Sequence, residues 1–370
     1  MKICYDGIGL SHFKNTSLYT YTFELLNRLP NLYPQAEYKV VSNKHISHSP
    51  LLNDKVDFLK INLNRLDNDY NLLESYLADG DIDIYHSPNN GFSLPAKKAC
   101  KYILTMHNLL PISQPKYVDI KYYDKFNTVV PISLQKADKI IAVSKFIKDE
   151  ILRHFNISED KIIVIYPALS EMFKPMNKEK CRFILKTKYD IDEDFLLFTG
   201  SIHERKNLDT IFIVFKKILN YYNNLKLLIV GNNLGKKQEL FLSLQEYAKE
   251  LNIHDNIIFT GLVDYEDMPY IYNSALCLIN ISDYEGFPTS TLEGAACGTP
   301  VVCSNSSSFR EVLGKSAIYI ENKDIDTLKN ILLETIDRKN DDFQKRDTQI
   351  IKYRGDNSIR ELVRVYESIV

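Results

Sequence analysis

Short apolar runs alternate with amphipathic stretches along most of the chain. These runs predict strands at residues 2–5, 38–42, 82–86, 102–106, 139–143 and 161–166 in the first half, and at 195–199, 226–230, 257–260, 275–279, 300–303 and 317–320 in the second. Strands that alternate with helices form parallel sheets with right-handed crossovers. Runs that are apolar almost throughout indicate sheets covered on both faces. The pattern therefore predicts an α/β fold with two parallel sheets.

The helical stretches separate the predicted strands and mark a boundary between two halves. They lie at 18–28, 129–136, 208–219, 237–251, 268–274, 291–297, 326–337 and 358–369. Pro167 and Pro175 bracket a break that a charged stretch, 177–188, follows. We expect one domain over residues 1–168 and a second over 169–351. Two similar α/β halves predict a ligand site in the cleft between them, at the carboxyl ends of the strands.

Composition narrows the function classes. The chain has 370 residues, a formal net charge of −2, 45% hydrophobic and 25% charged residues, which is typical of a globular protein and argues against a nucleic-acid partner. No apolar run approaches the roughly 18–20 residues that span a bilayer. The first strand reaches Asp6 too early for a signal peptide, so we expect a cytoplasmic location. The six cysteines form no C-x-x-C pair, which argues against a zinc or redox site and fits reduced, intracellular usage.

The segment 275–303, ALCLINISDYEGFPTSTLEGAACGTPVVC, carries the most chemistry. It reads as a strand, a polar loop and a short helix that Gly298 and Pro300 terminate. A helix N-terminus at the carboxyl edge of a sheet binds anions through its free N–H groups and dipole, and Thr289 and Ser290 add hydroxyl donors. Because ionised carboxylates accept hydrogen bonds from sugar hydroxyls, Glu285 and Glu293 suit ribose and hexose recognition. Taken alone, the two residues favour a structural interpretation, with Glu285 in a solvated turn and Glu293 on a helix surface.

The whole segment resembles the E-x7-E motif of family 4 retaining glycosyltransferases, E-G-F-[PG]-x-x-x-L-E-A/G-x-A-x-G-x-P-V. The resemblance implies the GT-B fold, with two Rossmann-like domains facing a central cleft. It implies that Glu285 is catalytic and binds the transferred sugar together with Gly286, Phe287 and Pro288. Backbone amides of residues 287–290, with Thr289 and Ser290, would contact sugar and diphosphate, and Glu293 would hold the ribose. It also implies that residues 352–370 cross back to the first domain, where Tyr353 replaces the usual Trp.

A second motif, FLLFTGSIHERKNL at residues 195–208, places two cations after a strand. Arg205 offers a planar fork for phosphate oxygens and Lys206 a point charge. Alone, these residues would also fit a solvated basic turn. The motif is similar to the family's G-x-x-x-x-R-K-N pattern, which implies that Gly200, Arg205 and Lys206 bind the donor diphosphate. In IIFTGLVD, residues 257–264, the resemblance places the backbone of Val263 near the base.

The first half carries the weaker motifs. YILTMHNLL places His107 after a strand, where the resemblance implies a catalytic position near the sugar, but Asn108 stands where the family prefers Asp. His86 in IDIYHSPNN is an even choice between an acceptor-side role and a structural one. Gly7 and Gly9 follow the first strand and suit donor phosphates. The family's G-x-G-R-Y run appears as residues 15–19, NTSLY, without either glycine.

The resemblance implies a retaining enzyme that moves a hexose from a nucleoside-diphosphate sugar to a glycan or lipid-linked acceptor. The form G-S-I-H-x-R-K-N resembles transferases of bacterial surface polysaccharides, so GDP-mannose or a UDP-sugar is the expected donor. We expect no cofactor and no metal, because the D-x-D tripeptides at 79–81, 81–83 and 192–194 read as turn and surface charges. The alternatives are a non-catalytic, glycan-binding partner of the same fold and a sugar-nucleotide epimerase.

One region suggests membrane contact. Residues 97–153 contain eleven Lys or Arg and five Asp or Glu, a net of +6 (11 − 5). A basic first domain could dock at the inner membrane face on anionic lipids, which suits a lipid-linked acceptor. Scattered solvated lysines explain the same count equally well.

Overall fold

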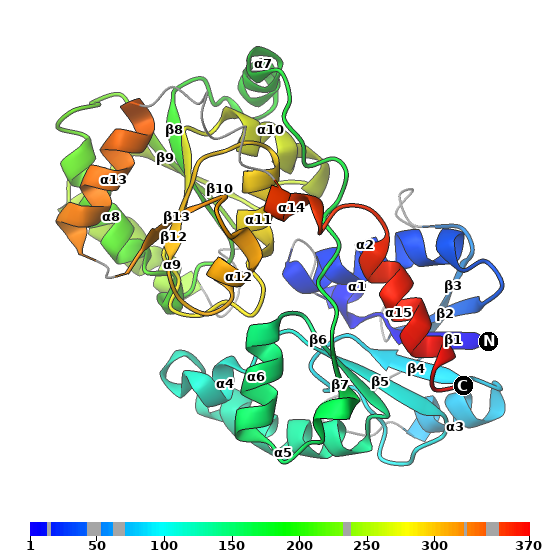
Figure 1. The fold of residues 1–370 in the computed structure, drawn as a ribbon. Helices are drawn as coiled ribbons and strands as arrows, with labels where there is room; N and C mark the ends of the chain where they lie inside the picture. The colour runs from blue at the N-terminus through cyan, green and yellow to red at the C-terminus, as the bar shows by residue number, and fades with distance from the viewer. Residues whose placement is uncertain (13–15, 43–52, 62–70, 232–237, 322–323, 338–347) are drawn as a thin grey trace. The chain divides into compact units, whose positions relative to one another are not determined.

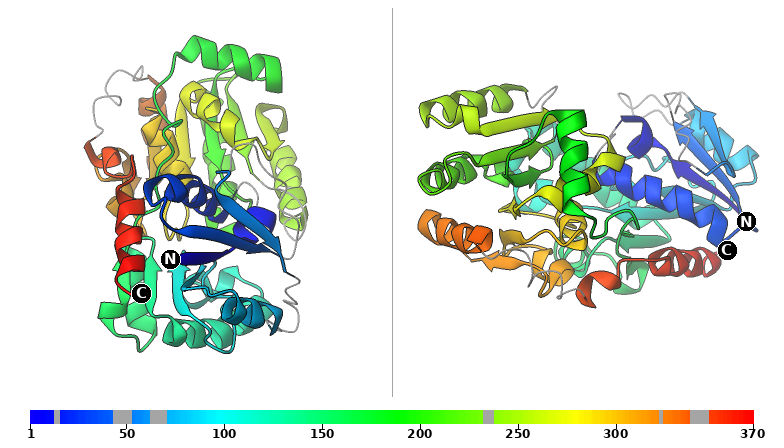
Figure 2. Two further views of the ribbon diagram at one scale, coloured as in Figure 1. Left: turned by 90° about the vertical axis from the view of Figure 1, so that its right-hand side faces the viewer. Right: turned by 90° about the horizontal axis from the view of Figure 1, so that it is seen from above.

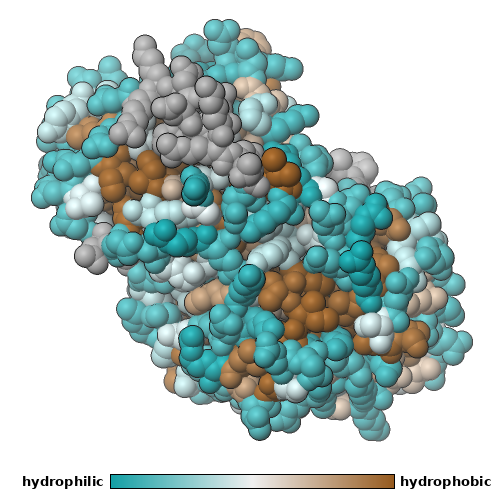
Figure 3. All heavy atoms as spheres, in the orientation of Figure 1, coloured by the Kyte–Doolittle hydropathy of each residue, from teal (hydrophilic) through white to brown (hydrophobic). Residues whose placement is uncertain are grey.

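A computed structural model describes the chain except residues 13–15, 43–52, 62–70, 232–237, 322–323 and 338–347. Contacts between Cα atoms divide it into two units, which are described separately. Unit 1 contains Met1–Ala168 and Tyr353–Val370, and unit 2 contains Leu169–Lys352. No described helix has the length and apolar character needed to cross a bilayer. Figure 3 shows hydrophobic patches scattered among a mainly hydrophilic surface on one face.

Unit 1 is built on a parallel sheet. Its described strands follow the order β3-β2-β1-β4-β5-β6-β7 (Figure 1). They are β1 (Lys2–Asp6), β2 (Glu37–Ser42), β3 (Val56–Lys60), β4 (Ile84–Ser87), β5 (Lys101–Met106), β6 (Lys139–Ala142) and β7 (Ile162–Val164). The helices are α1 (Ile8–His12), α2 (Ser17–Leu32), α3 (Asn71–Asp79), α4 (Leu110–Ser113), α5 (Ile120–Lys136), α6 (Lys145–His154) and α15 (Asn357–Glu367).

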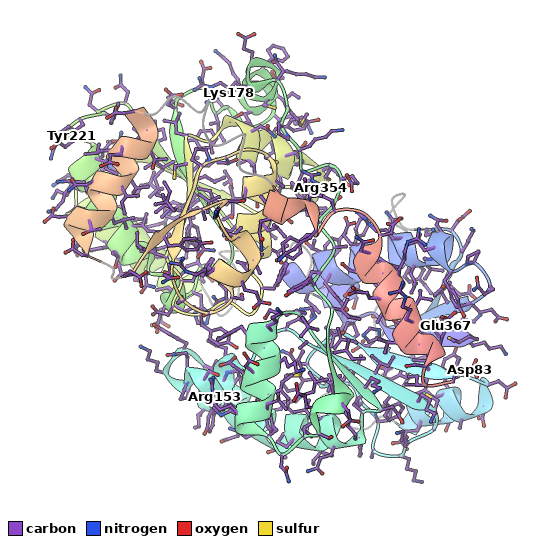
Figure 4. The ribbon with its side chains drawn as sticks, viewed as in Figure 1. Asp83, Arg153, Lys178, Tyr221, Arg354 and Glu367 are labelled. Carbon is purple, nitrogen blue, oxygen red and sulfur yellow. The ribbon has the colours of Figure 1, made fainter. Side chains whose placement is uncertain are left out.

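The sheet of unit 1 is covered on both faces. Ile3 and Tyr5 of β1 point into a core with α2 and α15, whereas Cys4 points to the opposite face and packs against α3. This alternation follows from the two-residue period of a strand. The last helix contributes Leu362, Val365 and Tyr366 to the first of these cores, and it lies beside α2 in Figure 1. In Figure 4, Arg354 lies between α14 and α15, and Glu367 lies near the end of α15.

Unit 2 contains a second parallel sheet, with described strands in the order β10-β9-β8-β11-β12-β13. The strands are β8 (Phe195–Thr199), β9 (Lys226–Val230), β10 (Ile257–Gly261), β11 (Cys277–Asn280), β12 (Val301–Ser304) and β13 (Ile318–Ile320). The helices are α7 (Lys178–Tyr189), α8 (Leu208–Ile218), α9 (Gln238–Glu250), α10 (Met268–Ser274), α11 (Thr289–Ala296), α12 (Phe309–Leu313), α13 (Ile325–Asp337) and α14 (Thr348–Ile351). Helices α8, α9 and α13 cover one face, and the further views in Figure 2 show helices on the other as well.

The predicted α/β class with two parallel sheets is confirmed, and several elements were not predicted. Strand β3 and helices α3, α6 and α7 fell in stretches without a clear apolar pattern. Helix α7 lies in the charged stretch 177–188, and it has signals for a helix at both ends. Asn177 caps its first turn by accepting from the Lys180 N–H, and Asp190 ends it in the left-handed region at φ 55°. Local capping, not hydrophobic periodicity, marks this helix.

Candidate functional site

Three loops of unit 2 follow neighbouring parallel strands and meet at one edge of the sheet. They are residues 200–207 after β8, residues 281–288 after β11, and residues 305–308 after β12, which we call the serine loop. The first two are joined through Asn207, which adopts φ 54° and donates from Nδ2 to the carbonyls of Arg205 and Ile281 at 3.1 and 2.9 Å. The Asp283 N–H adds a bond to the Arg205 carbonyl at 2.9 Å. Residues distant in sequence thus form one local framework.

The centre of this framework is a carboxylate held by two cations. Glu285 Oε1 lies 3.0 Å from Arg205 Nη1 and also pairs with Lys206 Nζ. Arg205 Nη1 donates to the Tyr284 carbonyl at 2.5 Å as well. The side chains of Lys206, Glu285 and Arg205 are only 6%, 12% and 16% exposed. These contacts bring the predicted diphosphate-binding and sugar-binding residues together.

The charges fix the ionisation of Glu285. Burial by itself would raise the pKa of this carboxyl, but the charges of Arg205 and Lys206 outweigh burial and lower the pKa to about 2. Glu285 is therefore an ionised hydrogen-bond acceptor at neutral pH. Arg205 keeps further donor capacity, because its Nε is buried without a hydrogen-bond partner among the described residues.

Glycines line the same edge of the sheet. A Cβ on Gly231 would lie 1.8 Å from the Gly200 carbonyl oxygen, so only glycine fits at the end of β9. Gly200 itself has φ 132°, and a Cβ there would lie 3.3 Å from Lys206 Nζ. Sequence reasoning missed Gly231, although a glycine directly after a buried strand is a recognisable sign of close backbone approach. Val263 is buried in the loop that follows β10.

Helix α11 begins beside the central carboxylate. Thr289 and Ser290 are partly exposed at its first turn, whereas Gly286, Phe287 and Pro288 are buried. Glu293 is 6% exposed, and its Oε2 accepts a hydrogen bond of 2.9 Å from the Tyr272 hydroxyl. The alternative of a helix-surface carboxylate is therefore wrong for Glu293.

The serine loop is the largest part of the site that sequence reasoning missed. Ser306, Ser307 and Ser308 donate to the carbonyls of Ser282, Asp283 and Glu285 at 3.1, 3.5 and 2.8 Å. The available signal was a run of hydroxyl residues at the end of a buried strand, adjacent to the strand that precedes the Glu285 loop.

In unit 1, His107 follows β5 and is held by the Asn90 side chain and the Pro88 backbone. The backbone N–H of His107 donates to Asn90 Oδ1 at 2.7 Å. The ring nitrogen Nε2 donates to the Pro88 carbonyl at 2.8 Å. Because a carbonyl only accepts, Nε2 carries the proton and Nδ1 is an acceptor in the neutral ring. Burial lowers the pKa of His107 to about 4, although the Pro88 carbonyl acts in the opposite direction. The Tyr21 ring meets the imidazole edge-on, with centroids 4.9 Å apart.

His86 has a structural position. It is fully buried, and its two ring nitrogens contact the Tyr366 hydroxyl at 2.7 Å and Thr105 Oγ1 at 2.8 Å. The Tyr5 hydroxyl also lies 2.7 Å from the Tyr366 hydroxyl. An acceptor-side role for His86 is therefore wrong, since both of its polar atoms are used inside the core. The network ties α15 to the sheet.

The remaining sequence features have ordinary partners. Asn108 accepts from the Leu110 N–H at 3.3 Å. Thr16, in the stretch that replaces the glycine-rich run, caps α2 by accepting from the Tyr19 N–H, while residue 15 lies outside the described residues. In the D-x-D tripeptides, Asp192 pairs with Lys186 at 2.6 Å, and Asp83 accepts from the Lys2 N–H at 2.7 Å.

Solved structures of similar fold define the class of the protein. Sucrose-phosphate synthase from Thermosynechococcus elongatus has a TM-score of 0.78 and 17% identity, over 100% of this chain and 99% of that one. Anabaena HepE in complex with UDP and glucose has a TM-score of 0.77 and 14% identity, over 100% of both chains. The two parallel α/β units are those of a GT-B glycosyltransferase fold.

Sequence comparison places the chain more narrowly. Two family models match, Glycosyltransferase Family 4 over residues 21–170 and Glycosyl transferases group 1 over residues 182–354. O-antigen chain mannosyltransferase B of Escherichia coli is 30% identical over 264 residues, 70% of this chain and 67% of that protein. O-antigen chain mannosyltransferase RfbU of Salmonella typhimurium is 26% identical over 254 residues, 69% and 66% of the two chains. The matches thus span about two thirds of these relatives. The chain belongs to glycosyltransferase family 4.

Proposed function

We propose that this protein is a retaining hexosyltransferase that takes mannose from GDP-mannose and adds it to a glycan or lipid-linked acceptor. The carrying observation is the pairing of Glu285 with Arg205 and Lys206 at the carboxyl edge of the unit 2 sheet. The mannosyltransferase relatives favour mannose as the sugar. A UDP-sugar is the second candidate donor, because HepE was solved with UDP-glucose.

In the donor complex, Arg205 and Lys206 bind the diphosphate while Glu285 stays paired with them. Arg205 and Lys206 carry two positive charges next to the single negative charge of Glu285, which suits the pair to phosphate. Arg205 Nε and the first-turn residues Thr289 and Ser290 add hydrogen-bond donors. These groups stabilise the negative charge that develops on the leaving diphosphate without a protein-bound metal.

Glu285 acts as a sugar-hydroxyl acceptor. A carboxylate whose pKa is about 2 is a weak base and a weak nucleophile, so hydrogen bonding suits it better than covalent attack on the anomeric carbon. We propose a front-face reaction. The bond from C1 to the phosphate oxygen breaks, the acceptor oxygen bonds to C1 on the same face, and the acceptor proton passes to the leaving phosphate. Configuration is then retained.

The other assignments follow the resemblance to the family. Glu293 is oriented by Tyr272 and receives the ribose hydroxyls, while the backbone at Val263 contacts the base. Neutral His107 presents Nδ1 as an acceptor for a sugar hydroxyl. With its pKa near 4, His107 stays uncharged across the neutral range.

A thermal-shift comparison of GDP, UDP and dTDP tests the donor. Ligands that bind the native state raise the melting temperature by mass action. We expect GDP to give the largest shift, and Arg205→Ala to weaken its binding about 10–100-fold through loss of a charge-assisted pair. Arg182→Ala is the matched control, since Arg182 pairs with Asp194 in the same unit. A larger melting-temperature shift with UDP than with GDP would contradict GDP-mannose as the donor and support a UDP-sugar.

Incubation of the protein with donor alone separates the transferase from its alternatives. Slow hydrolysis is expected of a transferase, because water replaces the acceptor. Formation of an epimeric sugar nucleotide would identify an epimerase. Absence of any turnover, with or without acceptor, would support a non-catalytic glycan-binding partner.

We also propose peripheral contact between unit 1 and the inner face of an anionic membrane. Lys116, Lys121 and Lys125 are exposed beside Ile120 and Tyr122, whose side chains are 69% and 37% exposed. Exposed cations next to apolar side chains suit an anionic lipid surface.

Liposome sedimentation tests this contact. We expect more protein to sediment with vesicles of anionic phospholipid than with neutral phosphatidylcholine, and replacement of the three lysines by glutamate to remove the difference. The same replacements at exposed Lys180, Lys186 and Lys249 of unit 2 are the control. Equal recovery with both vesicle types would rule out the docking.

A further inference from the structure

The serine loop binds the Glu285 loop through three consecutive hydroxyl groups. Ser306 reaches the Ser282 carbonyl, Ser307 the Asp283 carbonyl, and Ser308 the Glu285 carbonyl. Ser308 is fully buried, and its N–H also lies 3.4 Å from the Glu285 carbonyl oxygen. The two loops are therefore connected at three residues of the Glu285 loop, Ser282, Asp283 and Glu285.

The conformation of the serine loop favours this contact over a local one. Ser308 occupies the N-cap of α12, a position where serine ordinarily accepts a hydrogen bond from the helix. Here its side chain makes no capping bond and donates to the Glu285 loop instead. Ser307 adopts φ 53°, a left-handed conformation that is unfavourable for a residue with a side chain. The serine loop thus lacks a side-chain cap on α12 and adopts an unfavourable backbone conformation at Ser307, while both side chains bond to the Glu285 loop.

Two successive carbonyls of the Glu285 loop accept hydrogen bonds from two different loops. The Tyr284 carbonyl accepts from Arg205, and the Glu285 carbonyl accepts from Ser308. Gly286 follows directly, and a residue without a Cβ restricts φ and ψ less than other residues do. The peptide that carries the Glu285 side chain is thus fixed by hydrogen bonds rather than by the chain itself.

We infer that Ser308, assisted by Ser306, is a positioning residue that fixes the Glu285 carboxylate between Arg205 and Lys206 for sugar binding. The inference rests on the proposed function of Glu285. Loss of the Ser308 hydroxyl leaves the Glu285 carbonyl with a weaker partner and frees the peptide to rotate. A displacement of about 1 Å in a reacting group costs about 100-fold in rate.

The test measures donor turnover and nucleotide binding separately. Ser308→Ala is expected to lower kcat about 10–100-fold and to change the Kd of the nucleoside diphosphate, measured with GDP and UDP, less than about twofold. Ser274→Ala is the matched control, because Ser274 is fully buried in the same unit and its hydroxyl has no hydrogen-bond partner among the described residues. This control is expected to keep wild-type kcat. Unchanged kcat in Ser308→Ala would overturn the inference.

A double-mutant cycle shows whether Ser308 acts through Glu285. In a Glu285→Gln background, Ser308→Ala is expected to cause less than about a twofold further loss, because the group that it positions is already gone. A further loss equal to that in the wild-type background would assign Ser308 a separate role and overturn the inference. Wild-type activity in Glu285→Gln alone would instead refute the proposed role of Glu285.

Ser306→Ala keeps the inference testable where Ser308→Ala does not fold. Ser306 is only partly buried, so its replacement is less disruptive. We expect kcat to fall about 3–10-fold with unchanged nucleotide binding, because the bonds from Ser307 and Ser308 remain. Wild-type kcat in a folded Ser306→Ala protein would reject the positioning role.

Discussion

Glu285→Gln is expected to lower sugar transfer by about a thousandfold while nucleoside-diphosphate binding persists. Removal of one preorganised electrostatic contact at a transition state costs about 100–1000-fold, and this substitution also disrupts two ion pairs. The glutamine amide has one acceptor oxygen where the carboxylate has two, so it accepts fewer hydrogen bonds from sugar hydroxyls. Steady-state kinetics with GDP-mannose and isothermal titration with GDP measure the two effects.

The same variant is expected to depend more on its ligand for stability. Lys206 is 5% exposed, and without the Glu285 charge it is a buried cation with one fewer anion nearby. The melting temperature of unliganded Glu285→Gln should be lower than that of the wild type. Saturating GDP should raise the melting temperature of the variant by more than that of the wild type. Glu321→Gln is the control, because Glu321 is 70% exposed in the same unit. Transfer within about threefold of the wild type would contradict the assignment of Glu285.

Unit 1 is expected to lose about 4 kcal/mol of stability between pH 7.5 and pH 5, through two neutral histidines. Burial, with a smaller contribution from the charge of His107, lowers the pKa of His86 to about 3, and burial lowers that of His107 to about 4. Both folded pKa values lie below the ordinary value near 6.5, so unfolding takes up protons in the interval. Stability is thus complete above about pH 6.5 and falls as pH decreases, by about 2 kcal/mol for each histidine at pH 5.

Hydrogen exchange, corrected for its intrinsic pH dependence, resolves this effect by unit. Peptides from β4 and β5 should lose protection at pH 5, whereas those from β8 and β11 should keep it, because Glu285 with a pKa of about 2 contributes stability that is lost only below about pH 4.5. In the His107→Gln variant, the loss of protection of unit 1 between pH 7.5 and pH 5 should be smaller by the contribution of His107. The control His254→Gln, at a residue whose side chain is 51% exposed, should not. Equal protection of both units at pH 5 would contradict the prediction.

Most strands of unit 2 could be predicted from sequence because they are short, buried on both faces and therefore apolar throughout. The runs at residues 195–199 and 226–230 coincide with β8 and β9, and 268–274 coincides with α10. The predictions failed where elements are half exposed. Strand β3 has only one buried residue, Val56, and half of the residues of α7 are charged. Their formation depends on neighbours and caps that hydrophobic periodicity does not record.

The site shows a similar division. The motif residues were recognisable, but the contact between Glu285 and Lys206 joins positions 79 residues apart. That contact depends on β8 and β11 being neighbours in the sheet, which follows from topology rather than from local pattern. The serine loop depends on the next strand pair, β11 and β12. Glu293 could not be assigned to the interior because its partner, Tyr272, lies on another helix.

The return of α15 to unit 1 has a consequence for synthesis on the ribosome. The hydroxyl of Tyr366 is fully buried against Tyr5 and His86, so the core of unit 1 lacks this helix until unit 2, which precedes the helix in the chain, has been synthesised. Unit 2 is continuous over Leu169–Lys352 and can close as soon as it has left the exit tunnel. The nascent chain must therefore hold an incomplete first domain, with the surface for Leu362 and Val365 uncovered, while the second domain matures. Order of translation and order of completion are reversed, and chaperone demand should be concentrated on the N-terminal domain.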